Sequence, residues 1–192
     1  MSTRRAAALM AGVGLALTGC SAFEDPPPPT RITAPPESLA TAAPTTTPEF
    51  TTADGKFSQL MIPHHVQAVE LAELVPERTD SPEVLALAEE IKDAQQPETD
   101  RMTAWLQEWG LETETDVEGM LTDDEIQELR DLEGPEFDRR WLESMILHHE
   151  GAVLQAQTVL AAGVHRPTRA LAEEIISTRE AEITRMRAML GP

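Results

Sequence analysis

Four of the five histidines in this 192-residue chain occur as two adjacent pairs, and a methionine precedes each pair by one helical turn. If these segments are helical, each methionine shares a face with either histidine of its pair, because residues three and four apart are neighbours on a helix. Adjacent histidines point about 100° apart, so one pair cannot aim both rings at one point. The pattern predicts two halves of a metal site, although common ancestry of the two segments would also explain it. The six residues are Met61, His64, His65, Met145, His148 and His149.

Two glutamates are spaced to join these halves from the next helix of each segment. His148 precedes the expected turn by about as many residues as Glu182 follows it, so a rise of about 1.5 Å per residue puts both at one height. Glu98 stands in the same relation to the first histidine pair. A buried carboxylate is costly unless a metal or a positive charge accompanies it. The sequence leaves open an ion pair in place of a metal, with the candidate partners Arg101 and Arg185.

These residues recur because the chain contains an internal duplication. A shift of 84 residues superimposes segment 61–65 on 145–149 and segment 86–91 on 170–175 without a gap. A match of this length at one fixed offset indicates a repeat rather than chance. The two copies extend over residues 57–106 and 141–190.

Each copy predicts two helices joined by a short turn. Asp54 is a candidate cap for the first helix, and Ser81 followed by Pro82 is typical of the start of the second. In the second copy Gly134-Pro135 opens a helix, Gly163 ends it and Pro167 starts the last one. Between the copies, a capping-box pattern at 122–125 predicts a short helix ending near Leu132. The fold class is therefore all-α: a four-helix bundle of two duplicated helical hairpins, with a short extra helix in the crossover.

The second predicted helix carries one stripe at the helical period, which must face the core. The stripe includes two polar residues at the height of the histidines, and a methionine lies one turn beyond the glutamate in both copies. Whether Met102 and Met186 are ligands or core stays open. The stripe is Val84, Leu87, Ala88, Ile91, Gln95, Glu98, Met102 and Leu106.

The first 20 residues predict export with a lipid anchor. Arg4 and Arg5 precede a short apolar stretch and the sequence Leu17-Thr18-Gly19-Cys20, which resembles the bacterial lipobox. Cys20 is the acylation candidate, and the anchor makes the membrane a partner. Residues 21–53 are rich in proline and threonine and are expected to form an extended tether, with the helical domain spanning 54–192. The predicted localisation is extracytoplasmic, on the cell membrane.

The composition narrows the range of functions further. A formal charge of -19 repels phosphate backbones, so nucleic acid is not an expected partner. Glycine-rich phosphate loops, paired CxxC motifs, nucleophile elbows and HExxH motifs are missing from the sequence. His165, outside the pairs, is expected to be a solvated loop residue.

The MIPHH motif, the AEEI helix and the middle stretch Gly119-Met120-Leu121 together resemble the domain-of-unknown-function 305 family over residues 54–190. The resemblance implies a ferritin-like fold, export, and a copper-handling role for the two Met-His-His sets. The chain departs from the family at Leu71 and Gln155, where many members have a further methionine. It also has Pro97 beside Glu98, which is expected to kink the second helix.

Three functions follow as competing hypotheses. The first is an exported, lipid-anchored metal-binding protein that buffers or carries copper at the cell surface. The second is an oxidase with a di-iron-type site, for which iron would be the metal. Such sites use an ExxH motif, and neither histidine pair has a glutamate three residues ahead of it. The third is a structural or interaction module without metal.

Overall fold

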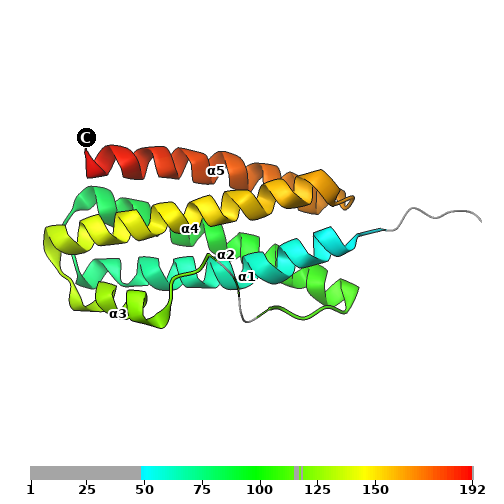
Figure 1. Cartoon of the computed structure of the whole chain (residues 1–192), viewed down its shortest axis with the longest axis horizontal. Helices are drawn as coiled ribbons and strands as arrows, with labels where there is room; N and C mark the ends of the chain where they lie inside the picture. The colour runs from blue at the N-terminus through cyan, green and yellow to red at the C-terminus, as the bar shows by residue number, and fades with distance from the viewer. Residues whose placement is uncertain (1–48, 115–116, 118, 192) are drawn as a thin grey trace, which may run out of the picture. The chain divides into compact units, whose positions relative to one another are not determined.

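The computed structural model describes residues 49–114, 117 and 119–191, and within these ranges the chain is helical and contains no β-strand. Four long helices and one short helix follow one another (Figure 1). The all-α fold class is thereby confirmed, whereas the predicted signal, Cys20 and the tether up to residue 48 lie outside the described residues. The α-helices are α1 Thr52–Glu73, α2 Pro82–Trp109, α3 Asp123–Asp131, α4 Gly134–Ala162 and α5 Arg166–Leu190, and a 3₁₀ turn spans Val75–Glu77.

The long helices pack as two hairpins that approach each other most closely through α1 and α4. α1 packs on α2, α4 packs on α5, and α1 and α4 pack on each other. Figure 1 shows α3 beside the bundle, at the end of the crossover between the hairpins. None of the helices in the described ranges is long and apolar enough to cross a membrane.

Most of the predicted helix ends are confirmed, and the first is corrected. Ser81 caps α2, Gly134 opens α4 and Gly163 ends it. The cap of α1 is Thr51, whereas Asp54 stands three residues further on as the second partner of a capping box. α2 continues through Pro97 to Trp109. A bend beside Glu98 remains a prediction.

Asp54 ties the start of α1 to the turn between α4 and α5. Its carboxylate accepts hydrogen bonds from the backbone amides of Thr51 at 2.8 Å, Val164 at 3.0 Å and His165 at 3.3 Å. Burial raises the pKa of Asp54, but these hydrogen bonds outweigh burial and lower it. The prediction of His165 as a solvated loop residue is wrong. Its ring caps α5 and lies edge-on to Trp105 and Trp109.

A layer of polar side chains divides the core into two apolar clusters. One cluster contains Met145 and Met186, and the other contains Met61 and Met102; all four are fully buried. On every long helix the histidines, glutamates and their polar neighbours lie between the segments that form the two clusters. The predicted stripe of α2 is buried in full.

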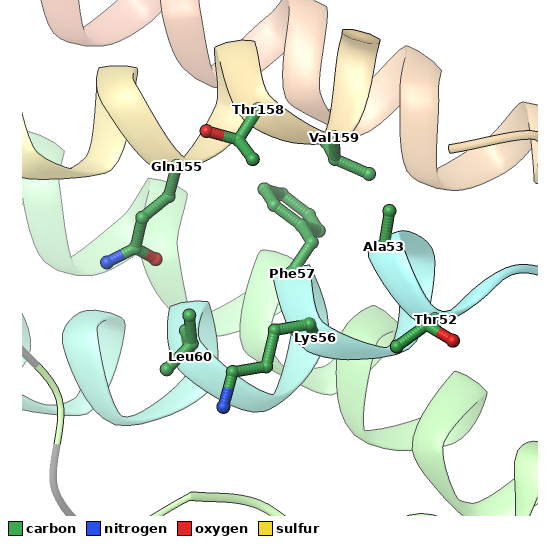
Figure 2. Close-up of a pocket in the computed structure, with 8 residues that line it drawn as sticks. All are labelled: Thr52, Ala53, Lys56, Phe57, Leu60, Gln155, Thr158 and Val159. Carbon is green, nitrogen blue, oxygen red and sulfur yellow. The ribbon is translucent and has the colours of Figure 1, made fainter. Parts of the chain in front are cut away.

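A pocket of about 320 Å³ lies between the start of α1 and the end of α4. Figure 2 shows the Phe57 ring directed toward Thr158 and Val159 across this gap. The lining is almost entirely apolar and lies away from the histidines. It consists of Thr52, Ala53, Lys56, Phe57, Leu60, Gln155, Thr158 and Val159.

Candidate metal centre

The two histidine pairs meet where α1 and α4 pack together. The ring centroids of His64 and His148 are 3.7 Å apart, and the rings are tilted by 39°. All four histidines are 1% exposed. Residues from the two copies of the repeat, 84 positions apart in sequence, therefore share one buried location.

Several ring nitrogens at this location have no hydrogen-bond partner. They are Nε2 of His64, Nδ1 of His65, and both nitrogens of His148 and of His149. An unsatisfied buried polar atom costs about 1–3 kcal/mol. Burial and, after it, the neighbouring histidines together lower the pKa of His64 to about 3 and the pKa of His148 well below 6.5. The rings are therefore neutral at pH 7, with lone pairs available to a metal.

The second histidine of each pair contacts the glutamate of its own hairpin. His65 Nε2 lies 2.6 Å from Glu98 Oε2 in a hydrogen bond. His149 Nε2 lies 2.9 Å from Glu182 Oε2, but without hydrogen-bond alignment. A carboxylate that holds one ring nitrogen orients the imidazole and leaves the other nitrogen as a candidate ligand. Burial is the larger effect on both histidines and lowers the pKa of each.

Arg179 joins the two glutamates. Its Nη2 lies 2.8 Å from Glu98 Oε2 and its Nη1 lies 3.2 Å from Glu182 Oε2, and the side chain is 1% exposed. Burial raises the pKa of both glutamates, but the histidine contacts and the guanidinium outweigh burial and lower it. Both carboxylates are therefore charged at neutral pH, and one cation neutralises half of their charge.

The arginines proposed from sequence as partners of these glutamates lie elsewhere. Arg101 pairs with Glu174 at 3.2 Å, and Arg185 pairs with Glu90 at 2.6 Å. The two pairs are equivalent under the repeat, and both link α2 to α5 near the surface. Arg179 was missed because an arginine on a helix is normally assigned to the solvated face. Its repeat equivalent is Gln95, a residue of the predicted core stripe, and this equivalence would have placed it inside.

The donor set fits a soft metal ion better than a hard one. Imidazole nitrogens without partners lie at the centre, and the four buried methionines lie in the clusters on either side. Among the residues with described positions, no three His, Cys, Asp or Glu side chains converge to hold an ion together. What the fold brings together is the facing pair His64 and His148, while the carboxylates are bound to Arg179.

A small pocket connects one of these histidines with the surface. It has a volume of about 240 Å³ and lies where the crossover meets α4. His148, Ser144 and Met120 line it, together with the backbone around Leu121. The side chain of Gln67 holds that backbone in place, with hydrogen bonds of 2.8 Å to both the amide and the carbonyl of Leu121.

The chain is similar to known proteins over its helical part. The family model described as "Domain of unknown function (DUF305)" matches residues 54–190. None of the curated proteins matches the chain significantly.

Solved structures of this family are similar in both sequence and fold. A DUF305 protein of Streptomyces coelicolor, described as secreted, is 33% identical, with 72% of this chain and 90% of that chain covered and a TM-score of 0.68. A DUF305 fragment from Deinococcus radiodurans is also 33% identical, covers 75% of this chain and 99% of its own, and has a TM-score of 0.69. CopM in its Cu(I)-bound form is 30% identical, with 69% and 91% covered and a TM-score of 0.60.

Proposed function

Because this chain belongs to the DUF305 family, we propose that its buried histidine layer binds a copper ion and that the protein buffers or carries copper outside the cytoplasm. The structural neighbour CopM, described in Cu(I)-bound and Cu(II)-bound forms, supports copper as the metal. The proposed ligands come from Met61, His64, His65, Met145, His148 and His149.

The contact between His64 and His148 is the observation that carries this proposal. Buried imidazoles with unpartnered nitrogens are unfavourable, and a bound ion would satisfy them. The two rings come from different copies of the repeat, so the proposed site belongs to the whole bundle. We therefore expect one high-affinity ion per chain and not one for each hairpin.

The role of Glu98 and Glu182 is indirect in this proposal. Glu98 holds His65 through a hydrogen bond, Glu182 lies against His149, and Arg179 occupies the space between the two carboxylates. A di-iron oxidase site, the alternative, uses carboxylates as ligands, and these two are already paired with a cation. The arrangement favours copper carriage over iron chemistry.

Export and anchoring complete the proposal. The lipobox at Cys20 would attach the protein to the membrane, and residues 21–53 would hold the helical domain away from it. The relative described as secreted supports the extracytoplasmic side. Replacing Cys20 by serine in a bacterial host should release the domain from the membrane fraction, and unchanged membrane association would contradict the anchor.

Copper titration tests the metal site directly. Purified protein is titrated with Cu(I) under reducing conditions against a chromophoric chelator, and with Cu(II) by calorimetry. Replacing both residues of either histidine pair by alanine should abolish high-affinity binding, because each pair supplies half of the site. His165→Ala is the matched control, since this histidine lies beside the start of α1, outside the buried layer of the other four.

The alternatives give different results in the same assays. Two sites of similar affinity, each surviving loss of the other histidine pair, would contradict a shared site and leave separate hairpin sites. Iron in protein purified without chelators, with a charge-transfer absorption band, would favour the oxidase. A protein that binds neither metal would be an interaction module.

A further inference from the structure

The guanidinium of Arg179, between Glu98 and Glu182, suggests how the site discriminates between metal ions. Two carboxylates that approach one point inside a protein would form a strong site for a divalent cation, because hard oxygen ligands suit such ions. Here the guanidinium of Arg179 lies at that point, within 2.8 Å of Glu98 and 3.2 Å of Glu182.

The arginine is fixed there by burial and by its bonds. Its side chain is 1% exposed, and Glu98 and Glu182 are 5% and 11% exposed. An arginine does not lose its proton in proteins, so this charge is permanent. A divalent ion entering between the carboxylates would have to displace the guanidinium or stay beside a like charge in a medium of low polarity.

The repeat shows that this charge is particular to the second copy. The residue equivalent to Arg179 is Gln95, which is also buried and whose Oε1 has no hydrogen-bond partner. A centre with a neutral amide at both positions would leave both carboxylates free for a metal. The arginine breaks this symmetry and neutralises one of the two negative charges.

We infer that Arg179 determines metal specificity, acting as a built-in cation that keeps hard divalent ions from Glu98 and Glu182 and leaves imidazole and thioether ligands to the copper ion. The inference rests on the proposed function for the identity of the metal that is accepted. The exclusion of divalent ions is a separate property, and it can be measured without copper.

The decisive variant is Arg179→Gln, which gives the second copy the residue of the first. Mn(II), which prefers oxygen ligands, is the probe, and binding is followed by its electron paramagnetic resonance signal. Arg179→Gln should bind Mn(II) at least about tenfold more tightly than the unmodified protein. Arg179→Lys keeps the charge and should stay close to the unmodified protein. Arg185→Gln removes a surface arginine of the same helix and should change nothing.

Stability provides a second readout for the case that Arg179→Gln unfolds without metal. Removal of the guanidinium leaves two negative charges buried together, so the variant should melt at a lower temperature than the unmodified protein. Mn(II) should raise that melting temperature, or restore the helical circular dichroism signal if it is lost, because the metal replaces the missing charge. Mn(II) should do neither for the unmodified protein.

The outcomes separate the two proposals. Equal Mn(II) binding by folded Arg179→Gln and the unmodified protein would overturn the inference, as would an unfolded variant that Mn(II) does not restore. A gain in Arg179→Lys as large as in Arg179→Gln would also overturn it, because charge would then not be the cause. If the unmodified protein fails to bind copper while Arg179→Gln gains Mn(II) affinity, the proposed function fails and the excluding role of Arg179 stands.

Discussion

The two copies of the hairpin present equivalent apolar surfaces, and in the described part of the chain a further helix covers one of them. In the second copy Trp141 and Phe137, together with Leu71 from α1, are fully buried under Ile126 and Leu129 of α3. Among the described residues, no helix lies over the equivalent surface beside Phe57, which forms the pocket of Figure 2. Duplication produced two surfaces, but the chain has one crossover between its copies. The covered half is completed by sequence that lies outside the repeat.

The ion pairs of repeat-equivalent residues also differ between the surface under α3 and the surface beside the pocket. Arg140 of α4 pairs with Glu128 of α3 at 2.9 Å, and its repeat equivalent, Lys56, pairs instead with Glu114 of the crossover. Glu70 pairs with Arg130 of α3, whereas its equivalent, Leu154, is 66% exposed. Side chains have therefore diverged according to whether α3 lies above them.

The largest expected effect concerns the aromatic residue on each surface. Trp141→Ala should reduce the free energy of unfolding by about 4 kcal/mol, because it leaves a large cavity and an unpaired Leu71 carbonyl, which now accepts a 2.8 Å hydrogen bond from the indole. Phe57→Ala should cost about half as much, since its ring borders a pocket that already exists. Urea unfolding measures both. Equal losses would show that the two surfaces are equally well packed.

A proline exchange tests the pair Pro97 and Ala181. Ala181→Pro should cost about 3 kcal/mol in a urea melt, because it removes a hydrogen bond inside α5 and introduces a clash. Pro97→Ala should be neutral or stabilising, since α2 already tolerates the ring. If Ala181→Pro costs under about 1 kcal/mol, the two helices are equally tolerant of proline and the asymmetry is superficial.

Acidification should destabilise the bundle through its two facing histidines, one from each copy. An unfolded histidine takes up a proton near pH 6.5, whereas folded His64 stays neutral down to about pH 3. The unfolded state thus binds more protons in this window, so the contribution of His64 is full above pH 6.5 and is lost as pH falls toward 3. From pH 7 to 5 the loss is about 2 kcal/mol.

Replacement of one facing histidine by phenylalanine, in either copy, tests this pH dependence. His64→Phe and His148→Phe should each flatten the slope of unfolding free energy against pH by about one proton, measured without metal between pH 5 and 7. A steeper slope in either variant, or no change in both, would contradict buried neutral histidines.

The smallest expected effect concerns Gln155, which lies at the pocket beside Phe57. Gln155 borders the pocket and its Oε1 is buried without a partner, whereas its repeat equivalent is the buried Leu71. Gln155→Leu should stabilise the fold by about 1 kcal/mol, because it removes the unsatisfied oxygen and adds apolar contact. A loss of stability in thermal melts would mean that the pocket is hydrated around this amide.

The periodic parts of the molecule were predictable from sequence, and the asymmetric parts were not. The α2 stripe follows from the helical period, which forces its members onto one face, and repeat equivalence carries that face over to α5. The sequence predicted that the two histidine pairs form two halves of one site, but it did not say that His64 and His148 would be the rings in contact. The ion pairs of Arg179 depend on which of several arginines turns inward, a choice that packing makes and periodicity does not. Applying the repeat to Gln95 would have predicted its burial, though not its two partners.

The hydrogen bonds of Asp54 would also affect how the domain responds to a mechanical pull on its N-terminal end. A pull on the chain ahead of Thr51 would reach α1 three residues before Asp54, whose carboxylate accepts hydrogen bonds from the amides of Val164 and His165. Tension would then pass into α1 and into the turn between α4 and α5 together, so both hairpins would share the load. Peeling α1 away from its end would first require breaking these bonds. A domain held in this way should resist pulling from its N-terminal end better than from its C-terminal end, where α5 stops at Leu190 without a comparable latch in the described structure.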